Sequence, residues 1–184
     1  MKFSTHQLVE VSLLVALALV LDLTAKFYFG WFWIYGGSVS LSIVPLAILA
    51  YRYGLKTGII GGVALGLLKL MVNPYILHPV QVLFDYPLPF AALGLAGYWA
   101  KQVNSLQGKK QGYYILLSTF VASMVRYVCH VFSGYVFFGA YAPEGMNPLI
   151  YSLVYNLGYV GASWILSAWI LIIIYRRHQT IIKV

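Results

Sequence analysis

Apolar residues form long runs along the chain, separated by polar stretches or by stretches rich in glycine and proline. A helix needs roughly 20 apolar residues to cross the hydrocarbon core of a bilayer. The run over 38–51 is short and begins with alternating serines, but a helix inside a bundle need not be apolar throughout. The pattern predicts an all-α integral membrane protein, a six-transmembrane-helix bundle in one membrane domain, residues 1–184. The predicted spans are 7–28, 38–51, 54–73, 79–100, 113–139 and 148–175.

Composition supports this class. Of the 184 residues, 61% are hydrophobic and 9% are charged, whereas about a quarter of a soluble domain is charged. This excludes a soluble enzyme, a disordered tail and an ordinary nucleic-acid-binding protein. The single cysteine, Cys129, excludes an internal disulfide and a cysteine metal cluster. The first apolar run is longer than a signal-peptide core and lacks a cleavage site, so we expect it to be retained as a helix.

The net charge of +8 becomes informative once its positions are known. With both termini cytoplasmic, nine basic residues fall on the cytoplasmic side of the six spans, as the positive-inside rule requires. The outer loops then hold only Lys26 and Glu144. Attraction to anionic lipid is a secondary interpretation of the charge. The nine residues are Lys2, Arg52, Lys56, Lys101, Lys109, Lys110, Arg176, Arg177 and Lys183.

Small residues recur at helical spacing in two spans. Glycines occupy every fourth position from 54 to 66 and form a flat stripe, which favours close packing inside the bundle. In the first span, Ser12 and Ala16 form a second small-residue face. There, docking of another membrane subunit and internal packing are both open interpretations.

Ionisable residues within spans are functional candidates by default. Asp22 and Lys26 are four residues apart, which favours an ion pair at the membrane interface. Lys69 lies near a span end, where its long side chain can reach water, and we expect a structural role. Asp85 follows Gln81 by one turn and precedes Pro87, which interrupts helical hydrogen bonding. We therefore expect a carboxylate beside a helix break that faces protein or a water-filled cavity.

Two further polar rows lie in the last two spans. Arg126, His130, Gly134 and Phe138 recur every four residues and share one face. The last span opens with tyrosines at 151, 155 and 159 and with Asn156. An interfacial aromatic belt is the plain interpretation of these tyrosines, and it is stronger for Tyr159 than for Tyr151.

One outward-facing cavity could collect the residues that fall in the outer half of the predicted bundle, which are Asp85, His130, Gly134, Phe138, Tyr151 and Asn156. Aromatic faces and a carboxylate suit a small, flat, cationic molecule. An internal Asp85–Arg126 salt bridge is the structural alternative. No P-loop, metal-ligand spacing or nucleophile with a partnered base is present, so no catalytic residue is predicted.

Several ordered motifs resemble one known family: Gly36-Gly37-Ser38-Val39-Ser40, His78-Pro79-Val80-Gln81 leading to Asp85-Tyr86, Arg126-Tyr127 with His130, Tyr141-Ala142-Pro143, and Tyr151-Ser152-Leu153 with Tyr155-Asn156. They are similar to those of thiamine-specific substrate-binding subunits (S-components) of energy-coupling factor (ECF) vitamin transporters. The likeness covers nearly the whole chain.

The resemblance implies a bacterial plasma-membrane protein that captures thiamine from outside with high affinity, without a cofactor or a metal. Its implied partners are a transmembrane coupling subunit, which would contact Ser12 and Ala16, and two cytoplasmic ATPases. A first-loop aromatic residue closes the site, with Trp31, Trp33 and Tyr35 as candidates and Trp33 preferred. The other implied thiamine-binding residues are Asp85, Tyr86, Arg126, His130, Gly134, Phe138, Tyr151 and Asn156.

Two other functions stay open on the residues alone. A stand-alone proton-coupled carrier of a small cationic aromatic solute would use Asp85 and His130 as titrating groups. The absence of an internal repeat of spans counts against it. A membrane enzyme is the third, and the missing catalytic constellation counts against that.

Overall fold

The computed structural model describes residues 4–34 and 36–177, and all elements formed by these residues are helices. The long ones are α1 (Thr5–Phe29), α2 (Ile43–Val72), α6 (Gly108–Phe137) and α7 (Pro148–Arg177). Shorter pieces lie between α2 and α6: α3 (Pro79–Asp85), α4 (Pro87–Leu93), η2 (Gly94–Trp99) and α5 (Ala100–Ser105). The 3-10 turns η1 (Gly30–Phe32) and η3 (Gly139–Tyr141) follow α1 and α6.

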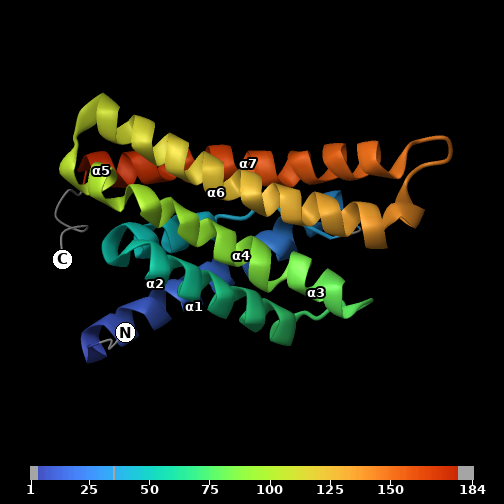
Figure 1. Ribbon diagram of the computed structural model, residues 1–184, viewed down its shortest axis with the longest axis horizontal. Coiled ribbons are helices and arrows are strands. Elements are labelled where there is room, and N and C mark those ends of the chain that lie inside the picture. Colours follow the sequence, from blue (N-terminus) through green and yellow to red (C-terminus); the bar gives the residue numbers. More distant parts are fainter. Residues whose placement is uncertain (1–3, 35, 178–184) are drawn as a thin grey trace.

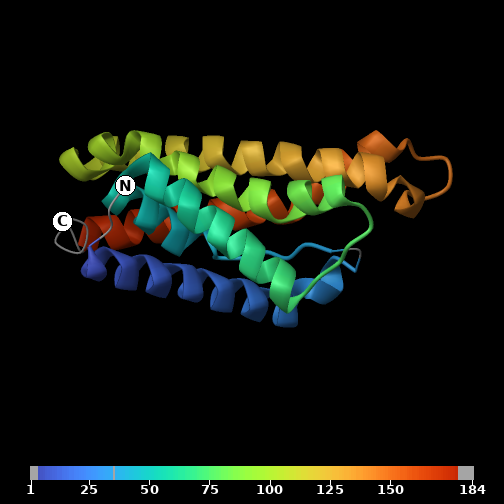
Figure 2. The ribbon, with the colours of Figure 1, turned by 60° about the horizontal axis from the view of Figure 1, so that its bottom comes forward.

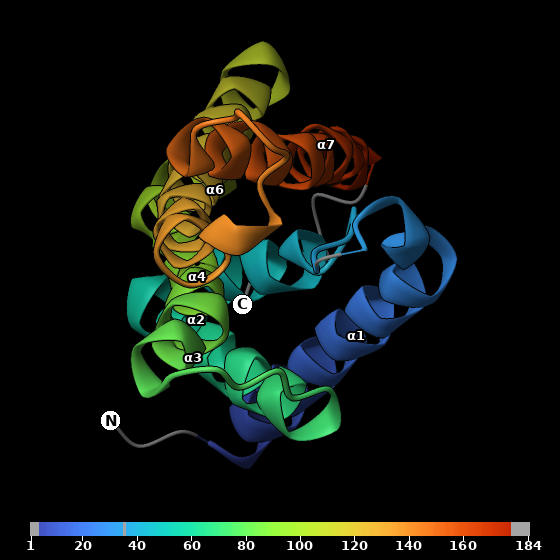
Figure 3. The ribbon, with the colours of Figure 1, turned by 90° about the vertical axis from the view of Figure 1, so that its right-hand side faces the viewer.

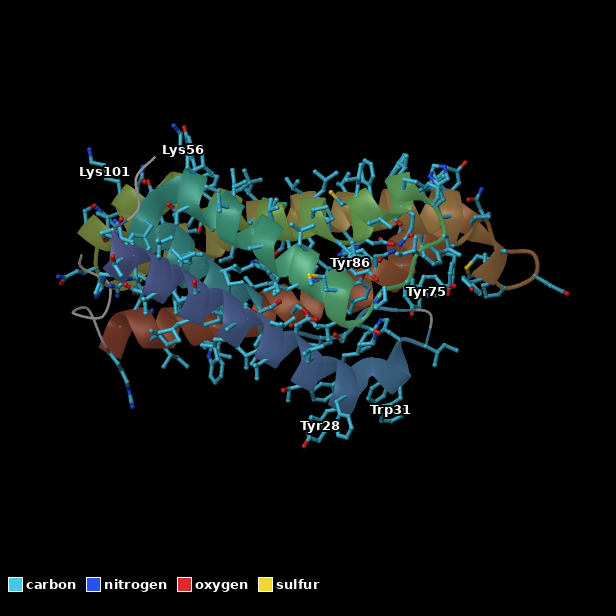
Figure 4. All side chains as sticks on the ribbon, turned by 90° about the horizontal axis from the view of Figure 1, so that it is seen from below. Tyr28, Trp31, Lys56, Tyr75, Tyr86 and Lys101 are labelled. Carbon is cyan, nitrogen blue, oxygen red and sulfur yellow. The ribbon has the colours of Figure 1, made fainter. Side chains whose placement is uncertain are left out.

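Five helical segments of the described chain are long and apolar enough to cross a membrane: Thr5–Phe32, Ile43–Val72, Pro79–Ser105, Gly108–Phe137 and Pro148–Arg177. They lie roughly along one common direction (Figure 1). The start of α1 and the end of α7 are at the same end of the bundle (Figure 2). Lys56 and Lys101 also lie at this end (Figure 4).

The predicted spans 38–51 and 54–73 meet in one element, α2, which is broken at Gly54. Gly54 has φ 82° and ψ 178°, a conformation that only glycine adopts readily. The chain folds back there and brings the two halves of α2 together. A methyl group built on Gly58 would lie only 2.7 Å from Cβ of Ala50. The first half of α2 is shorter than predicted, since 38–42 are not helical. In this segment Ser163 Oγ accepts a hydrogen bond from the Ser40 amide at 2.9 Å.

The glycine stripe packs inside the bundle, as its spacing favours. Methyl groups on Gly62 and Gly66 would collide with the backbone of residues 86–91, and one on Gly58 would also meet Gly94. The second half of α2 therefore lies backbone to backbone against α4 and η2. The predicted break near Pro87 is present, because Tyr86 has φ −118° and ψ −82° and separates α3 from α4.

Helix α1 lies at the edge of the bundle and packs chiefly against α2 (Figure 3). Both acids of α1 pair with cations of α2. Glu10 Oε1 lies 2.7 Å from Arg52 Nε, and Asp22 Oδ2 lies 2.6 Å from Lys69 Nζ. The predicted interfacial Asp22–Lys26 pair is therefore wrong, because Asp22 is buried and turns toward α2. Lys69 turns inward to meet it rather than reaching for water.

Candidate functional site

A cavity of about 620 Å³ lies between α1, α2, α3, α4, α6 and α7, with residues from the first loop also in its wall. All nine residues predicted to bind a ligand line it, although they come from four separate parts of the chain. They are Trp33, Asp85, Tyr86, Arg126, His130, Gly134, Phe138, Tyr151 and Asn156.

The carboxylate of Asp85 is held at the end of α3 by two neighbours. Gln81 Nε2 donates a hydrogen bond to Asp85 Oδ2 at 2.6 Å, and His130 Nδ1 lies 3.5 Å from Asp85 Oδ1. The Gln81 amide also donates to the Tyr75 carbonyl at 3.1 Å. The alternative Asp85–Arg126 ion pair is not formed, because His130 stands between the two groups and accepts from Arg126 Nε at 3.4 Å. Asp85 keeps a partly exposed side chain, 21% accessible.

The linker before α3 is fastened to the cavity wall by Tyr86. The Tyr86 hydroxyl donates to the Asn73 carbonyl at 3.1 Å and accepts from the Tyr75 amide at 2.8 Å. Tyr86 is buried, and it lies near Tyr75 in Figure 4. Because its hydroxyl already has two protein partners, Tyr86 chiefly shapes the cavity.

Helices α6 and α7 approach closely at Gly134. A methyl group at this position would collide with Oγ of Ser152, so glycine is required for the contact. Ser152 Oγ in turn donates to the Val131 carbonyl at 2.9 Å. Asn156 Nδ2 donates to the Ser152 carbonyl at 2.8 Å. The close approach places the Asn156 amide in the cavity wall opposite α3.

Aromatic rings form much of the remaining wall. Phe138 stacks on Tyr75, with centroids 5.8 Å apart, and on Tyr141 at 6.1 Å. Trp33 meets the ring of Tyr159 edge-on at 6.2 Å. Such faces attract flat rings and cations.

The first-loop candidates separate clearly. Trp33 is half-buried and lines the cavity. Trp31 is 67% exposed and stacks on Phe32, and it projects away from the bundle in Figure 4. Tyr35 lies outside the described residues.

The interpretation of Tyr159 as a membrane-belt residue is wrong. Tyr159 is buried, lines the cavity and donates from its hydroxyl to Asn156 Oδ1 at 2.6 Å. Its position three residues after Asn156 was the available signal, since i and i+3 share a helix face. The sequence reasoning also missed Tyr75 and the Asp22–Lys69 pair, which line the same cavity. For Asp22 and Lys69 the available signal was their ionisable character within a span, whereas no local pattern pointed to Tyr75.

Ser12 and Ala16 lie away from the cavity, on the exposed side of α1. Leu13 and Leu17 beside them are 65% and 48% exposed. Among the residues that the structure describes, no three His, Cys, Asp or Glu side chains gather closely enough to hold a metal ion.

Comparisons with known proteins identify the family of this chain. A family model described as thiamine transporter protein matches residues 8–183. The chain belongs to the thiamine transporter family. It is 35% identical to the thiamine transporter ThiT of Bacillus subtilis (strain 168) over 182 residues, which cover 96% of this chain and 94% of that protein.

Two further relatives agree. ThiT of Lacticaseibacillus paracasei is 32% identical over 128 residues, covering 65% of this chain and 64% of that protein. A solved structure of ThiT from Listeria monocytogenes superposes with a TM-score of 0.81 at 28% identity, covering 91% of this chain and 92% of that chain. Membership of this bacterial transporter family, with helices suited to span a bilayer, makes the chain a multi-pass plasma-membrane protein with a transport role rather than a catalytic one.

Proposed function

We propose that this chain is the thiamine-binding S-component of an ECF-type importer, which captures thiamine with high affinity from outside the cell. The observation that carries the proposal is the cavity, which gathers a partly exposed carboxylate, stacked aromatic rings and an amide in one place. Thiamine combines a permanently cationic thiazolium ring with an aminopyrimidine. Asp85 supplies a counter-charge, while the rings and Asn156 supply stacking and orientation.

Energy would come from other subunits. The chain has no P-loop, so we assign ATP hydrolysis to two cytoplasmic ATPases that act through a transmembrane coupling subunit. The face around Ser12 and Ala16 suits that contact, since it is exposed and small residues permit close helix approach in lipid. Six membrane crossings with both termini cytoplasmic would place the basic end of the bundle beside the ATPases. The fold-back at Gly54 supports counting residues 38–53 and 55–72 as two crossings, the first of which would include the non-helical residues before Ile43.

Binding by the isolated chain is the first test. Purified protein in detergent is titrated with thiamine, riboflavin, biotin and folate in parallel, and tryptophan fluorescence is recorded. We expect quenching by thiamine alone, because Trp33 lies in the cavity wall. Equal responses to several vitamins, or none to thiamine, would contradict the proposal.

The docking face is tested with Ala16→Trp, which places a large side chain on the exposed side of α1 and away from the cavity. We expect normal thiamine binding and loss of uptake in cells that contain the whole transporter. Ile165→Trp, at a similarly exposed position of α7 that does not line the cavity, is the matched control. Loss of binding in Ala16→Trp would instead show that this face packs internally.

A proton-coupled carrier is separated by transport assays. Liposomes that contain only this chain are loaded under an imposed pH gradient. Thiamine accumulation there would favour the carrier, whereas binding without accumulation fits the S-component.

A further inference from the structure

The buried guanidinium of Arg126 contacts a cavity histidine rather than an acid. Arg126 is 3% exposed. Its Nε donates to His130 Nε2 at 3.4 Å, and its charged centre lies 5.0 Å from the ring centroid of Phe90. Arginine has donors only and does not lose its proton in proteins. His130 Nε2 must therefore offer a lone pair, so this nitrogen carries no proton.

The other nitrogen of the imidazole follows from this. With Nε2 as acceptor, the single proton of the ring sits on Nδ1, which lies 3.5 Å from Asp85 Oδ1. The second carboxylate oxygen accepts from Gln81. Donors therefore converge on Asp85 from two sides: Gln81 donates to one carboxylate oxygen, and a neutral His130, itself the acceptor from Arg126, faces the other with its Nδ1 proton.

The remaining charged and titratable groups around His130 agree with a neutral ring. Besides Asp85 of α3 and Arg126 of α6, Lys69 of α2 also lines the cavity, with Nζ 4.6 Å from the Phe90 centroid. Lys69 is paired with Asp22 of α1. From α7, the Tyr159 ring lies 5.9 Å from the imidazole centroid. Two cations share the ring of Phe90, and a third cation on His130 would be repelled.

We propose that Arg126 is a positioning residue, which acts on the ligand through His130 by keeping the imidazole neutral with its proton on Nδ1. The carboxylate of Asp85 then keeps its full negative charge for a cationic ligand. Without Arg126, His130 would take up a second proton and form an ion pair with Asp85, which would compete with the ligand. This inference rests on the proposed binding of a cation in the cavity.

The direction in which affinity for thiamine changes with pH follows from this role of Arg126. Protonation of His130 rises as the pH falls, so a chain that lacks Arg126 loses affinity for thiamine toward low pH. In the variants without the Arg126 charge, we expect affinity for thiamine to fall about fourfold between about pH 8 and about pH 6, as His130 gains its second proton. The parent protein, with His130 held neutral, should change by less than about twofold over the same interval.

The binding experiment compares Arg126→Met, Arg126→Gln and Arg126→Lys by calorimetric titration with thiamine across this interval. Met and Gln lack the charge, and we expect affinity for thiamine to fall steeply toward low pH in both variants. The Gln variant therefore provides the test if the Met variant does not fold. Lys keeps a cationic donor and should restore the flat profile. Arg176→Met, in the last turn of α7, is the matched control and should behave as the parent.

A second measurement needs no ligand. Nitrogen-15 spectra of histidine-labelled parent protein, with His130 assigned by comparison with His130→Gln, should show a protonated Nδ1 and an unprotonated Nε2 at about pH 6.5. An imidazolium or the opposite tautomer overturns the inference, as do flat profiles in the Met and Gln variants or a steep profile in Arg126→Lys. If the parent does not bind thiamine, the proposed function fails, and the spectra still decide the state of His130.

Discussion

The charge on Asp85 should supply most of the discrimination for a cationic ligand, and Asp85→Asn isolates it. The substitution keeps the size of the side chain and an oxygen that accepts from Gln81. Two opposite charges about 5 Å apart interact by about 3 kcal/mol at an effective dielectric constant of about 20. Because the Asp85 side chain is 21% exposed, solvent screens part of this energy. We expect affinity for thiamine to fall about 30- to 200-fold, which corresponds to about 2–3 kcal/mol.

Asparagine also introduces a mismatch in the free protein. Asp85 accepts from Gln81 on one oxygen and faces the Nδ1 of His130 with the other. Asparagine has one oxygen and one NH₂ group, so one neighbour meets a donor instead. A buried polar group without a partner costs about 1–3 kcal/mol. Thermal unfolding without ligand therefore has to be measured beside binding.

A neutral ligand separates charge from shape. Isothermal titration of parent, Asp85→Asn and Asp85→Glu is carried out with thiamine and with an analogue in which an uncharged thiophene replaces the thiazolium. The Asn variant should lose affinity for thiamine and change little toward the analogue, whereas the Glu variant should keep most of the preference for the cation. Equal losses for both ligands, or thiamine binding within about twofold of the parent, would refute the electrostatic reasoning.

Two further predictions concern packing around the cavity. Gly134→Ala should abolish thiamine binding and lower the unfolding temperature, because the new methyl group collides with Ser152 Oγ. Gly161→Ala, which has only an ordinary contact at 3.8 Å, is the control, and tolerance of both changes would contradict this account. Asp22→Asn leaves a buried lysine unpaired and should destabilise the protein by about 3–5 kcal/mol, while adding Lys69→Met should recover most of the loss, as thermal unfolding would measure. No recovery in the double variant would mean that the pair is not the cause.

Periodicity predicted the parts of the site that lie on one regular helix. Arg126, His130 and Gly134 share a face because α6 is continuous through all three, and Phe138 follows as the residue that caps its C-terminal end, so spacing alone placed them together. The position of Asp85 beside a helix break was also accessible, since Pro87 has no amide hydrogen to donate. In both cases the determining interactions lie within a few residues of each other.

Contacts between distant segments were out of reach. Asp22 has a basic residue four positions away in Lys26, yet it pairs with Lys69, because the packing of α1 on α2 determines which cation it meets. Likewise, the run over 38–51 predicted a helix, but residues 38–42 are not helical. The amides of Ser40 and Ser42 donate to serine hydroxyls, one of which belongs to Ser163 of α7. A sequence pattern does not reveal such partners.

That non-helical segment has a consequence for how the protein is made. The first half of α2 begins only at Ile43, and the backbone before it depends on Ser163, which is 123 residues further along the chain. An unpaired amide in hydrocarbon is costly, so we expect this stretch to take its place in the bilayer late. It should stay in contact with water until α7 has been synthesised and inserted. The wall of the cavity beside Trp33 is therefore among the last parts of the molecule to form.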